Sequence, residues 1–340
     1  MTRLPHFSGL LSGSPRHKLV RMVARRTVAL VGAALALSIG LGVTRADGAR
    51  RLLSLGLLGD PTRFEAQTGQ RSRVRLLIVG WGQGGTPAYF SGLLVTMLGE
   101  PMLGLTTGPQ GGEAITPAQI AHGVGDAYLA AINQALADWV KPVYVRPFAE
   151  MNGYWNAYSA FNQNGTPRDA AHSTAAFRKA FARVYLILHG GTGVNGRLAR
   201  LGLPPFQGTL HADANVRVVW NPQGFGDPDL PGNSAQAYYP GDRYVDVVGD
   251  DLYFIRGKAS WDAAEALYKA HPGKPFGFPE WGLWDIDDPA FVAQMASFLR
   301  THPRVEVANY YSGKAASVFD LASKPRSRAA YRQLIVPLGR

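Results

Sequence analysis

Residues 73–81 read RVRLLIVGW, an apolar run typical of a strand buried on both faces. Similar runs recur along the chain, and helical patterns separate most of them. The predicted strands cover residues 73–81, 101–105, 118–123, 143–148, 216–220, 245–252, 275–278 and 305–310. The predicted helices cover residues 88–98, 126–139, 170–189, 261–269 and 289–300.

Strands that alternate with helices imply a parallel sheet. The eight predicted strands and the 340-residue length fit an α/β fold of the (β/α)8 TIM barrel type, which we expect over residues 47–340. An open doubly wound sheet is the alternative. It normally has a glycine-rich phosphate loop after its first strand. Residues 80–85 (GWGQGG) are glycine-rich, but Trp81 would crowd a pyrophosphate.

Residues 1–46 have the composition of an export leader. Residues 27–43 are uncharged, follow an arginine-containing stretch at 21–26, and precede a small-x-small cleavage candidate at 44–46. We expect a signal peptide or, if uncleaved, a signal anchor as the sole membrane contact. The protein is then secreted or periplasmic, or membrane-anchored by residues 27–43. Translation from Met22 would give a leader of ordinary length.

The net charge of +11 does not indicate nucleic-acid binding. Residues 1–51 contain nine basic residues and one acidic residue, whereas the rest contains 26 basic and 23 acidic residues. A nucleic-acid interface needs clustered charge on the folded domain. The chain has no cysteine, which excludes disulfides and thiolate metal sites, and its eight histidines lack metal-ligand spacing. We expect a monomer that needs no cofactor and no metal.

Two stretches place a glutamate beside Trp and Gly at the end of a predicted strand. They are residues 145–155 (VRPFAEMNGYW) and 274–282 (KPFGFPEWG). The carboxyl ends of barrel strands form the active-site face. There, one carboxyl group can protonate a glycosidic oxygen while another attacks the anomeric carbon. Other polar residues at predicted strand ends are Asn152, Asn221, Asp250, Asp251, Tyr253 and Asn309.

These stretches resemble glycoside hydrolase family 26, the β-mannanase family within the retaining barrel glycosidases. Residues 146–155 (RPFAEMNGYW) are similar to the family's acid/base motif R-P-F-H-E-M-N-G-x-W. Residues 239–253 (YPGDRYVDVVGDDLY) match Y-P-G-D-x-Y-V-D-x-x-G-x-D-x-Y, and residues 274–282 match K-P-x-x-x-x-E-x-G. The resemblance spans roughly residues 60–312. It departs at Ala149, where the family has His.

The resemblance implies that Glu150 is the acid/base and Glu280 the nucleophile. Arg146 and Tyr253 are expected to hold Glu280 ionised and oriented. The further residues expected to bind substrate or to support the site are Asn152, Trp155, Asp251, Trp281, Tyr310 and Tyr311. We expect the ring of Trp155 to stack on a sugar. Trp281 could instead be a core residue. Trp284 is expected in the core, and the pattern does not decide between Tyr310 and Tyr311.

The sequence therefore predicts a retaining endo-glycanase similar to mannan endo-1,4-β-mannosidases. Its polysaccharide substrate is expected to be mannan-like, a mixed-linkage glucan, a xylan or an exopolysaccharide. The alternative from another functional class is a non-catalytic carbohydrate-binding barrel. The replacement of the family's His by Ala149 supports this alternative. Retention of both Glu150 and Glu280 argues against it. A transglycosylase that remodels a surface polysaccharide would share every residue named here.

Overall fold

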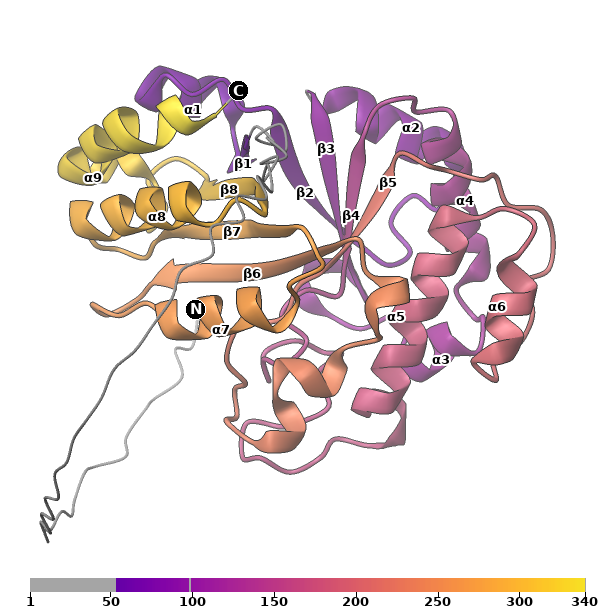
Figure 1. Cartoon of the computed structure of the whole chain (residues 1–340). Helices are drawn as coiled ribbons and strands as arrows, with labels where there is room; N and C mark the ends of the chain where they lie inside the picture. Colours follow the sequence, from indigo (N-terminus) through magenta and orange to yellow (C-terminus); the bar gives the residue numbers. More distant parts are fainter. Residues whose placement is uncertain (1–52, 98, 340) are drawn as a thin grey trace, which may run out of the picture. The chain divides into compact units, whose positions relative to one another are not determined.

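The computed structural model describes residues 53–97 and 99–339. Eight parallel strands close into a barrel in chain order, and the helices surround it (Figure 1). This confirms the predicted (β/α)8 fold. The predicted leader, residues 1–46, lies outside the described residues. Within the described ranges, no helix has both the length and the apolar character needed to cross a membrane.

The strands of the barrel are β1 (Ser54–Gly59), β2 (Val74–Gly80), β3 (Glu100–Thr106), β4 (Val143–Pro147), β5 (Val216–Trp220), β6 (Val247–Phe254), β7 (Phe276–Leu283) and β8 (Val305–Gly313). The α-helices are α1 (Pro61–Thr68), α2 (Pro87–Thr96), α3 (Pro117–Ala121), α4 (Asp126–Ala137), α5 (Thr174–His189), α6 (Val194–Arg200), α7 (Trp261–Ala270), α8 (Pro289–Thr301) and α9 (Pro325–Ala330). Except for residues 118–123, every predicted strand and helix forms, with bounds that differ by a few residues.

The strand predicted at 118–123 is wrong, because this segment forms helix α3. Thr116 and Gln119 make a reciprocal capping box, and Pro117 occupies the first turn, where it is compatible with a helix. The prediction also missed β1, whose sequence SLGLLG contains two glycines. Gly56 is required there, because a Cβ at this position would overlap Asn309 Oδ1 inside the barrel. The predicted number of strands was correct only because these two errors offset each other.

The barrel consists of two groups of strands joined by short seams. Strand β1 pairs with β2 only at Gly56–Val74 and Leu57–Arg75. Strand β5 pairs with β6 only at two neighbouring positions, Val219 and Trp220. Pairing is longer inside the group β2–β5 and inside the group β6–β7–β8–β1. The two groups are visible in Figure 1 as differently oriented sets of strands.

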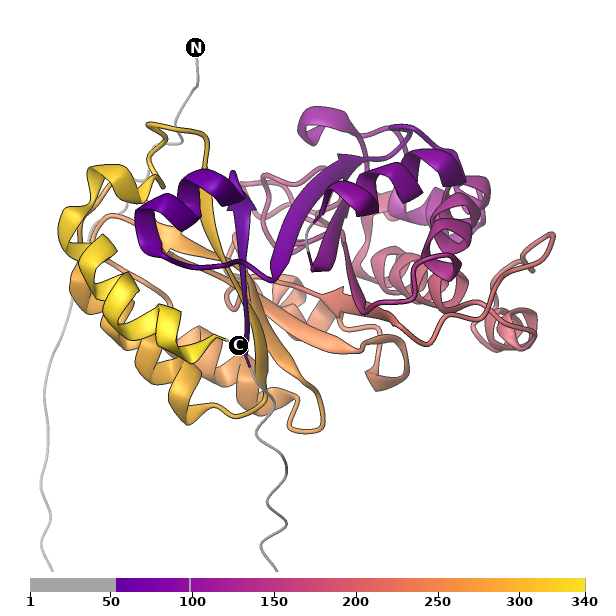
Figure 2. The ribbon, with the colours of Figure 1, turned by 90° about the horizontal axis from the view of Figure 1, so that it is seen from above.

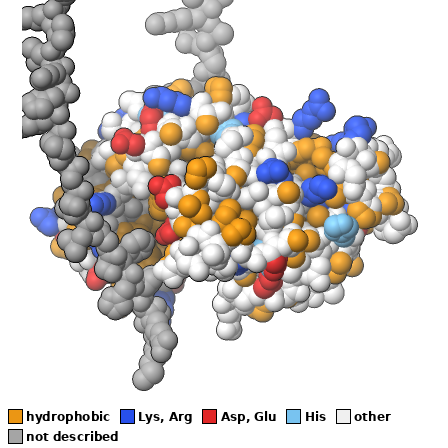
Figure 3. All heavy atoms as spheres, turned by 90° about the horizontal axis from the view of Figure 1, so that it is seen from below, with side chains coloured by type: hydrophobic (Ala, Val, Ile, Leu, Met, Phe, Trp, Pro, Cys, Tyr) orange, Lys and Arg blue, Asp and Glu red, His pale blue; other side chains and the backbone are white. Residues whose placement is uncertain are grey.

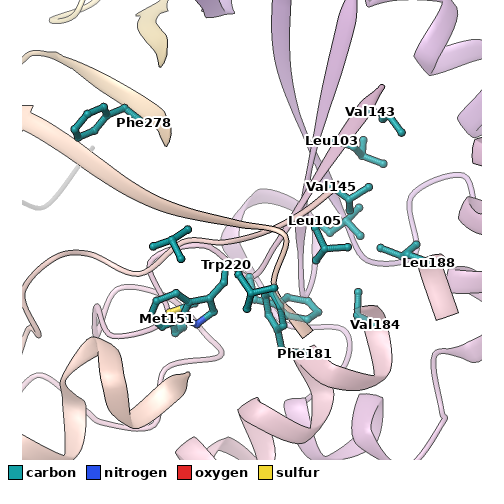
Figure 4. Close-up of a cluster of buried hydrophobic side chains, with 14 of the residues drawn as sticks. Leu103, Leu105, Val143, Val145, Met151, Phe181, Val184, Leu188, Trp220 and Phe278 are labelled. Atoms are coloured by element: carbon teal, nitrogen blue, oxygen red, sulfur yellow. The ribbon is translucent and has the colours of Figure 1, made fainter. Parts of the chain in front are cut away.

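Alternate side chains of each strand face the barrel interior or the surrounding helices. The interior is filled by Val74, Leu76, Met102, Tyr144, Val219, Val247 and Val307. On the outside, Leu103 and Leu105 of β3 and Val145 of β4 face Val184 and Leu188 of α5 (Figure 4). Each such buried side chain contributes about 1.5–3 kcal/mol. This packing fixes the end of β4, from which the first candidate catalytic residue projects.

Candidate active site

The chain turns sharply where β4 ends. Phe148 and Glu150 have φ angles of 52° and 54°, in the left-handed region that non-glycine residues seldom adopt. The Glu150 backbone N–H donates to Asn221 O at 2.7 Å, which ties the turn to the end of β5. Strained backbone of this kind persists where the surroundings over-determine it, commonly at functional sites. The turn directs the Glu150 side chain toward the site.

Both carboxylate oxygens of Glu150 accept hydrogen bonds from neutral N–H groups. Trp155 Nε1 donates to Oε2 at 2.7 Å, and Gln223 Nε2 donates to Oε1. Burial and the negative charge of Glu280 raise the pKa of Glu150, whereas these two donors and Arg146 oppose the rise. The balance is a raised pKa, which suits a group that must hold a proton near neutral pH.

Glu280 has charged and hydroxyl partners instead. Arg146 Nη1 donates to Oε1, and the Tyr253 hydroxyl donates to Oε2 at 2.5 Å. The Glu280 backbone N–H also donates to Asp251 Oδ1 at 3.1 Å. Only 8% of Glu280 is exposed. A carboxylate held by a guanidinium and a hydroxyl has a fixed direction.

Arg146 joins strands from both groups. It lies on β4 and is buried, and its Nη2 donates to Asp251 Oδ2 on β6 while Nη1 reaches Glu280 on β7. Its Nε donates to Asn221 Oδ1 at 2.7 Å. One guanidinium thus satisfies three acceptors, and the two carboxylates raise its pKa despite its burial. Arg146 is the main polar link across the β5–β6 seam at the site.

The site contains more carboxyl groups than cations. Asp250 and Asp251 are both buried on β6, where the pairing with β7 is irregular between Gly249 and Asp251. Burial raises the pKa of Asp250 to about 8, although the Gly224 N–H donates to its Oδ1 at 2.8 Å. Burial also raises the pKa of Asp251, and Arg146 opposes this rise. Close carboxyl groups with one guanidinium favour retention of a proton in the cluster.

Asn152 supports the site by holding the loop after β5, and it does not face the cleft. It is fully buried, and its side chain bonds both the N–H and the carbonyl of Gln223 at 2.9 Å. This fixes the loop after β5, and Gln223 in turn contacts Glu150. The sequence analysis missed Gln223. Its position directly after the strand-end residues Asn221 and Pro222 was the available signal.

Trp281 and Tyr310 do not reach the cleft, so the core alternative holds for Trp281 and Tyr310 is not the inward-facing tyrosine. Trp281 and Tyr310 are completely buried, and their rings pack on each other with centroids 5.1 Å apart. Successive strand residues point to opposite faces, so Glu280 and Tyr311 face inward while these two face the helices. Tyr311 is half-buried, and the charges of Glu280 and Glu150 raise its pKa in addition to desolvation. Of Tyr310 and Tyr311, Tyr311 is therefore the one beside the carboxyl groups.

Trp155 and Trp284 are the two exposed tryptophans of the site, at 45% and 42%. The core position expected for Trp284 is wrong, because Trp284 follows the end of β7. Its ring lies 6.4 Å from that of Tyr253, the partner of Glu280. Trp155 lies on the Glu150 side, and Gly153 leaves room for its ring. Aromatic faces thus flank both carboxyl groups, and such faces suit the C–H-rich surfaces of sugars.

Asn309 was expected at a strand end, which is wrong because β8 continues to Gly313. It lies inside the barrel, where its Nδ2 contacts Met102 Sδ at 3.4 Å. The structure describes no group of three or more His, Asp and Glu side chains arranged to hold a metal ion in residues 53–97 and 99–339.

No family model and no curated protein matches the chain. Its structure is similar to a GH26 β-mannanase from Bacteroides ovatus, with a TM-score of 0.52 and 17% identity, over 84% of this chain and 88% of that chain. The GH26 domain of an endo-β-mannanase/endo-β-glucanase from Prevotella bryantii follows, with a TM-score of 0.49, 15% identity, and 84% and 89% coverage. At these identities the Bacteroides ovatus likeness establishes a shared fold, the barrel that the resemblance implied.

Proposed function

We propose that this protein is a glycoside hydrolase of the family 26 type that cleaves a β-linked polysaccharide internally, with retention of configuration. The observation that carries the proposal is the contrast between the two glutamates. Glu280 is held by Arg146 and Tyr253, whereas Glu150 has a raised pKa and neutral donors. An ionised nucleophile and a protonated acid are what a retaining glycosidase needs.

In the first step, a Glu280 oxygen attacks the anomeric carbon, and the bond to the glycosidic oxygen breaks. Glu150 gives its proton to the departing oxygen, so the leaving chain ends in a hydroxyl group. The products are a glycosyl ester on Glu280 and an ionised Glu150. Tyr253 and Arg146 position the attacking carboxylate, and Trp155 holds the acid by its Oε2.

In the second step, Glu150 takes a proton from water while the water oxygen attacks the anomeric carbon, and Glu280 leaves as a carboxylate. The geometry supports this exchange of roles. The charge of Glu280 is one reason that the pKa of Glu150 is raised. That charge disappears when the ester forms, so the pKa of Glu150 falls at the stage where Glu150 must act as a base.

The substrate we propose is a mannan-like or related β-linked glycan. The neighbour from Bacteroides ovatus is a β-mannanase, which supports mannan as the first polymer to test. Ala149 has no hydrogen-bonding side chain beside Glu150, and this favours a sugar whose own substituent occupies the adjoining space. A xylan, a mixed-linkage glucan or an exopolysaccharide therefore belongs in the same assay. The leader at residues 1–46 supports action outside the cytoplasm.

The test is hydrolysis of these polymers by the wild type, Glu150→Ala and Glu280→Ala, with reducing ends and product length as readouts. Both variants should lose turnover. Added azide should restore turnover in both, and the glycosyl azides that the two variants form should have opposite anomeric configurations. Glu65→Ala on α1 is the control, because Glu65 forms only an exposed ion pair with Arg71. Binding without cleavage by the wild type would instead favour a carbohydrate-binding barrel. Longer products would favour a transglycosylase.

A further inference from the structure

A large cavity opens beside the Glu280 side of the site. Its volume is about 940 Å³, and it is bordered by the ends of β1 and β8, the start of α1 and the loop after β8. Figure 2 shows α1 next to this loop, and Arg63 joins them by donating to Gly313 O at 2.6 Å. Tyr311 forms part of the wall and also feels the charges of both catalytic glutamates. Tyr311 is thus shared by the cavity wall and the surroundings of the two glutamates.

The cavity lies at the short seam between β1 and β2. These strands separate beyond Leu57 and Arg75, and the cavity is lined both by Leu58, which packs with the barrel interior, and by Arg75. Its aromatic and aliphatic lining includes Tyr311, Phe319 and Val318. A space with an aromatic wall, one of whose residues lies near the two glutamates, fits a further sugar unit or a branch of the same polymer.

The charged residues of the cavity are mainly basic. Arg63, Arg75 and Lys314 line it, against one carboxylate, Asp60. Arg63 is neutralised by buried Asp320 at 2.6 Å. Arg75 donates to a carbonyl, Thr96 O, and no ion pair is seen for Arg75 or Lys314 among residues 53–97 and 99–339. Two cations in the cavity walls thus lack a carboxylate partner in the described part of the chain.

We infer that this cavity binds an acidic sugar residue of the substrate polymer, with a carboxylate or a similar anionic substituent directed toward Lys314 and Arg75. The inference rests on the proposed function and narrows its substrate to an anionic polysaccharide. The reaction centre itself contains Glu150, Glu280, Asp250 and Asp251 against a single Arg146. An anionic polymer would be repelled there unless cations nearby offset the repulsion. The cavity supplies such cations.

The test compares acidic polymers with uncharged forms of the same chains. Glucuronoxylan and xanthan are each used as such and after carboxyl reduction, which removes the charge but keeps the backbone and branches. Binding to the full-length protein is measured by affinity electrophoresis at low and high salt, so the result does not depend on turnover. The variants are Lys314→Gln and Lys141→Gln. Lys141 is also an exposed lysine, it precedes β4 at the opposite end of the barrel, and its loss changes the net charge by the same amount.

The wild type should bind at least one acidic polymer more tightly than its carboxyl-reduced form, and salt should remove the difference. Lys314→Gln should weaken binding to the acidic polymer about two- to fivefold, the range for one exposed ion pair, with no effect on the reduced form. Lys141→Gln should have no effect on either. Charge reversal in Lys314→Glu should give a larger loss than Lys314→Gln.

Equal binding of acidic and reduced polymers, absence of binding to both acidic polymers, or equal effects of Lys314→Gln and Lys141→Gln would overturn the inference. Hydrolysis of neutral polymers with no such preference would leave the proposed function intact. Conversely, charge-dependent binding that needs Lys314, with no hydrolysis of any polymer, would support the acidic-sugar site and count against the proposed enzyme. The two failures are therefore distinguishable.

Discussion

The surroundings of Glu150 and Glu280 differ although both side chains are the same. Glu150 belongs to the strand group β2–β5, and its carboxylate is bonded by the neutral donors Trp155 and Gln223. Glu280 belongs to the other group and is bonded by Arg146 and Tyr253. Two identical side chains of one site thus differ in their partners, neutral donors for Glu150 and a guanidinium for Glu280, and such a difference can separate an acid from a nucleophile.

Charged side chains are scattered over the molecular surface but are clustered in the site. On the face shown in Figure 3, Lys and Arg side chains of the described residues are scattered among uncharged ones. The site instead concentrates Asp250, Asp251 and both glutamates around Arg146. Such concentrated charge is costly to bury and is found where it serves chemistry.

The largest effect is expected for Arg146→Met. Removal of the guanidinium leaves Glu280 and Asp251 buried without their cation, which we expect to lower the free energy of unfolding by about 3–5 kcal/mol. Urea unfolding at pH 7 measures this loss. The loss should be smaller in acid, because protonation removes the uncompensated charges. A variant as stable as the wild type at pH 7 would mean that Arg146 does not hold the two strand groups together.

The second prediction concerns Ala149, beside Glu150. Its carbonyl accepts a hydrogen bond from the Tyr158 hydroxyl at 2.5 Å, but its methyl group can donate none to a sugar. If the substrate is plain mannan, Ala149→His should raise kcat/KM by up to roughly a hundredfold, for a transition-state contact of about 2–3 kcal/mol. If a bulkier sugar fills this space, the same variant should lose activity on that sugar without gaining any on mannan.

Tyr253→Phe is expected to have a smaller effect. It removes the hydroxyl that orients Glu280 Oε2 but leaves Arg146 on Oε1. Since one of two donors remains, we expect kcat to fall about tenfold, near the lower limit of about 1.5 kcal/mol for a hydrogen bond to a charged group. Steady-state kinetics should show KM nearly unchanged. An unchanged kcat would show that Arg146 alone positions the nucleophile.

Local patterns predicted much of this arrangement from the sequence, and they failed where three-dimensional pairing decides. Glu150, Glu280 and Arg146 stand in contiguous motifs at strand ends, so their convergence followed from the barrel. Gln223 lies outside these motifs and only follows the strand-end residues Asn221 and Pro222, and its contact with Glu150 depends on a loop held by Asn152. β1 was missed because its two glycines make its sequence a poor strand signal, although one of them, Gly56, is required beside Asn309.

The alternation of strand residues explains the remaining errors. Trp281 and Tyr310 are neighbours in sequence of Glu280 and Tyr311, and proximity in sequence led to the expectation of sugar contact. The side-chain period of two places them on the opposite face, against the helices. Trp284, just past β7, is freed from this alternation and is exposed at the site. Strand phase, which depends on bulges such as the one in β6, could not be read from the sequence.

The smallest effect is expected for Gln223→Met, and it tests the Glu150 side of the comparison directly. Gln223 donates to Oε1 of Glu150 and opposes the rise of its pKa. Loss of this donor should raise the pKa of the acid further, because a hydrogen bond to the ionised form is removed. Because a general acid works only while protonated, activity falls as pH rises through this pKa. The alkaline limb of the kcat/KM profile should therefore move to higher pH. Tyr253→Phe, which acts on the other glutamate, is the matched control and should leave that limb in place. An alkaline limb that moves to lower pH in Gln223→Met would exclude Glu150 as the acid that sets it.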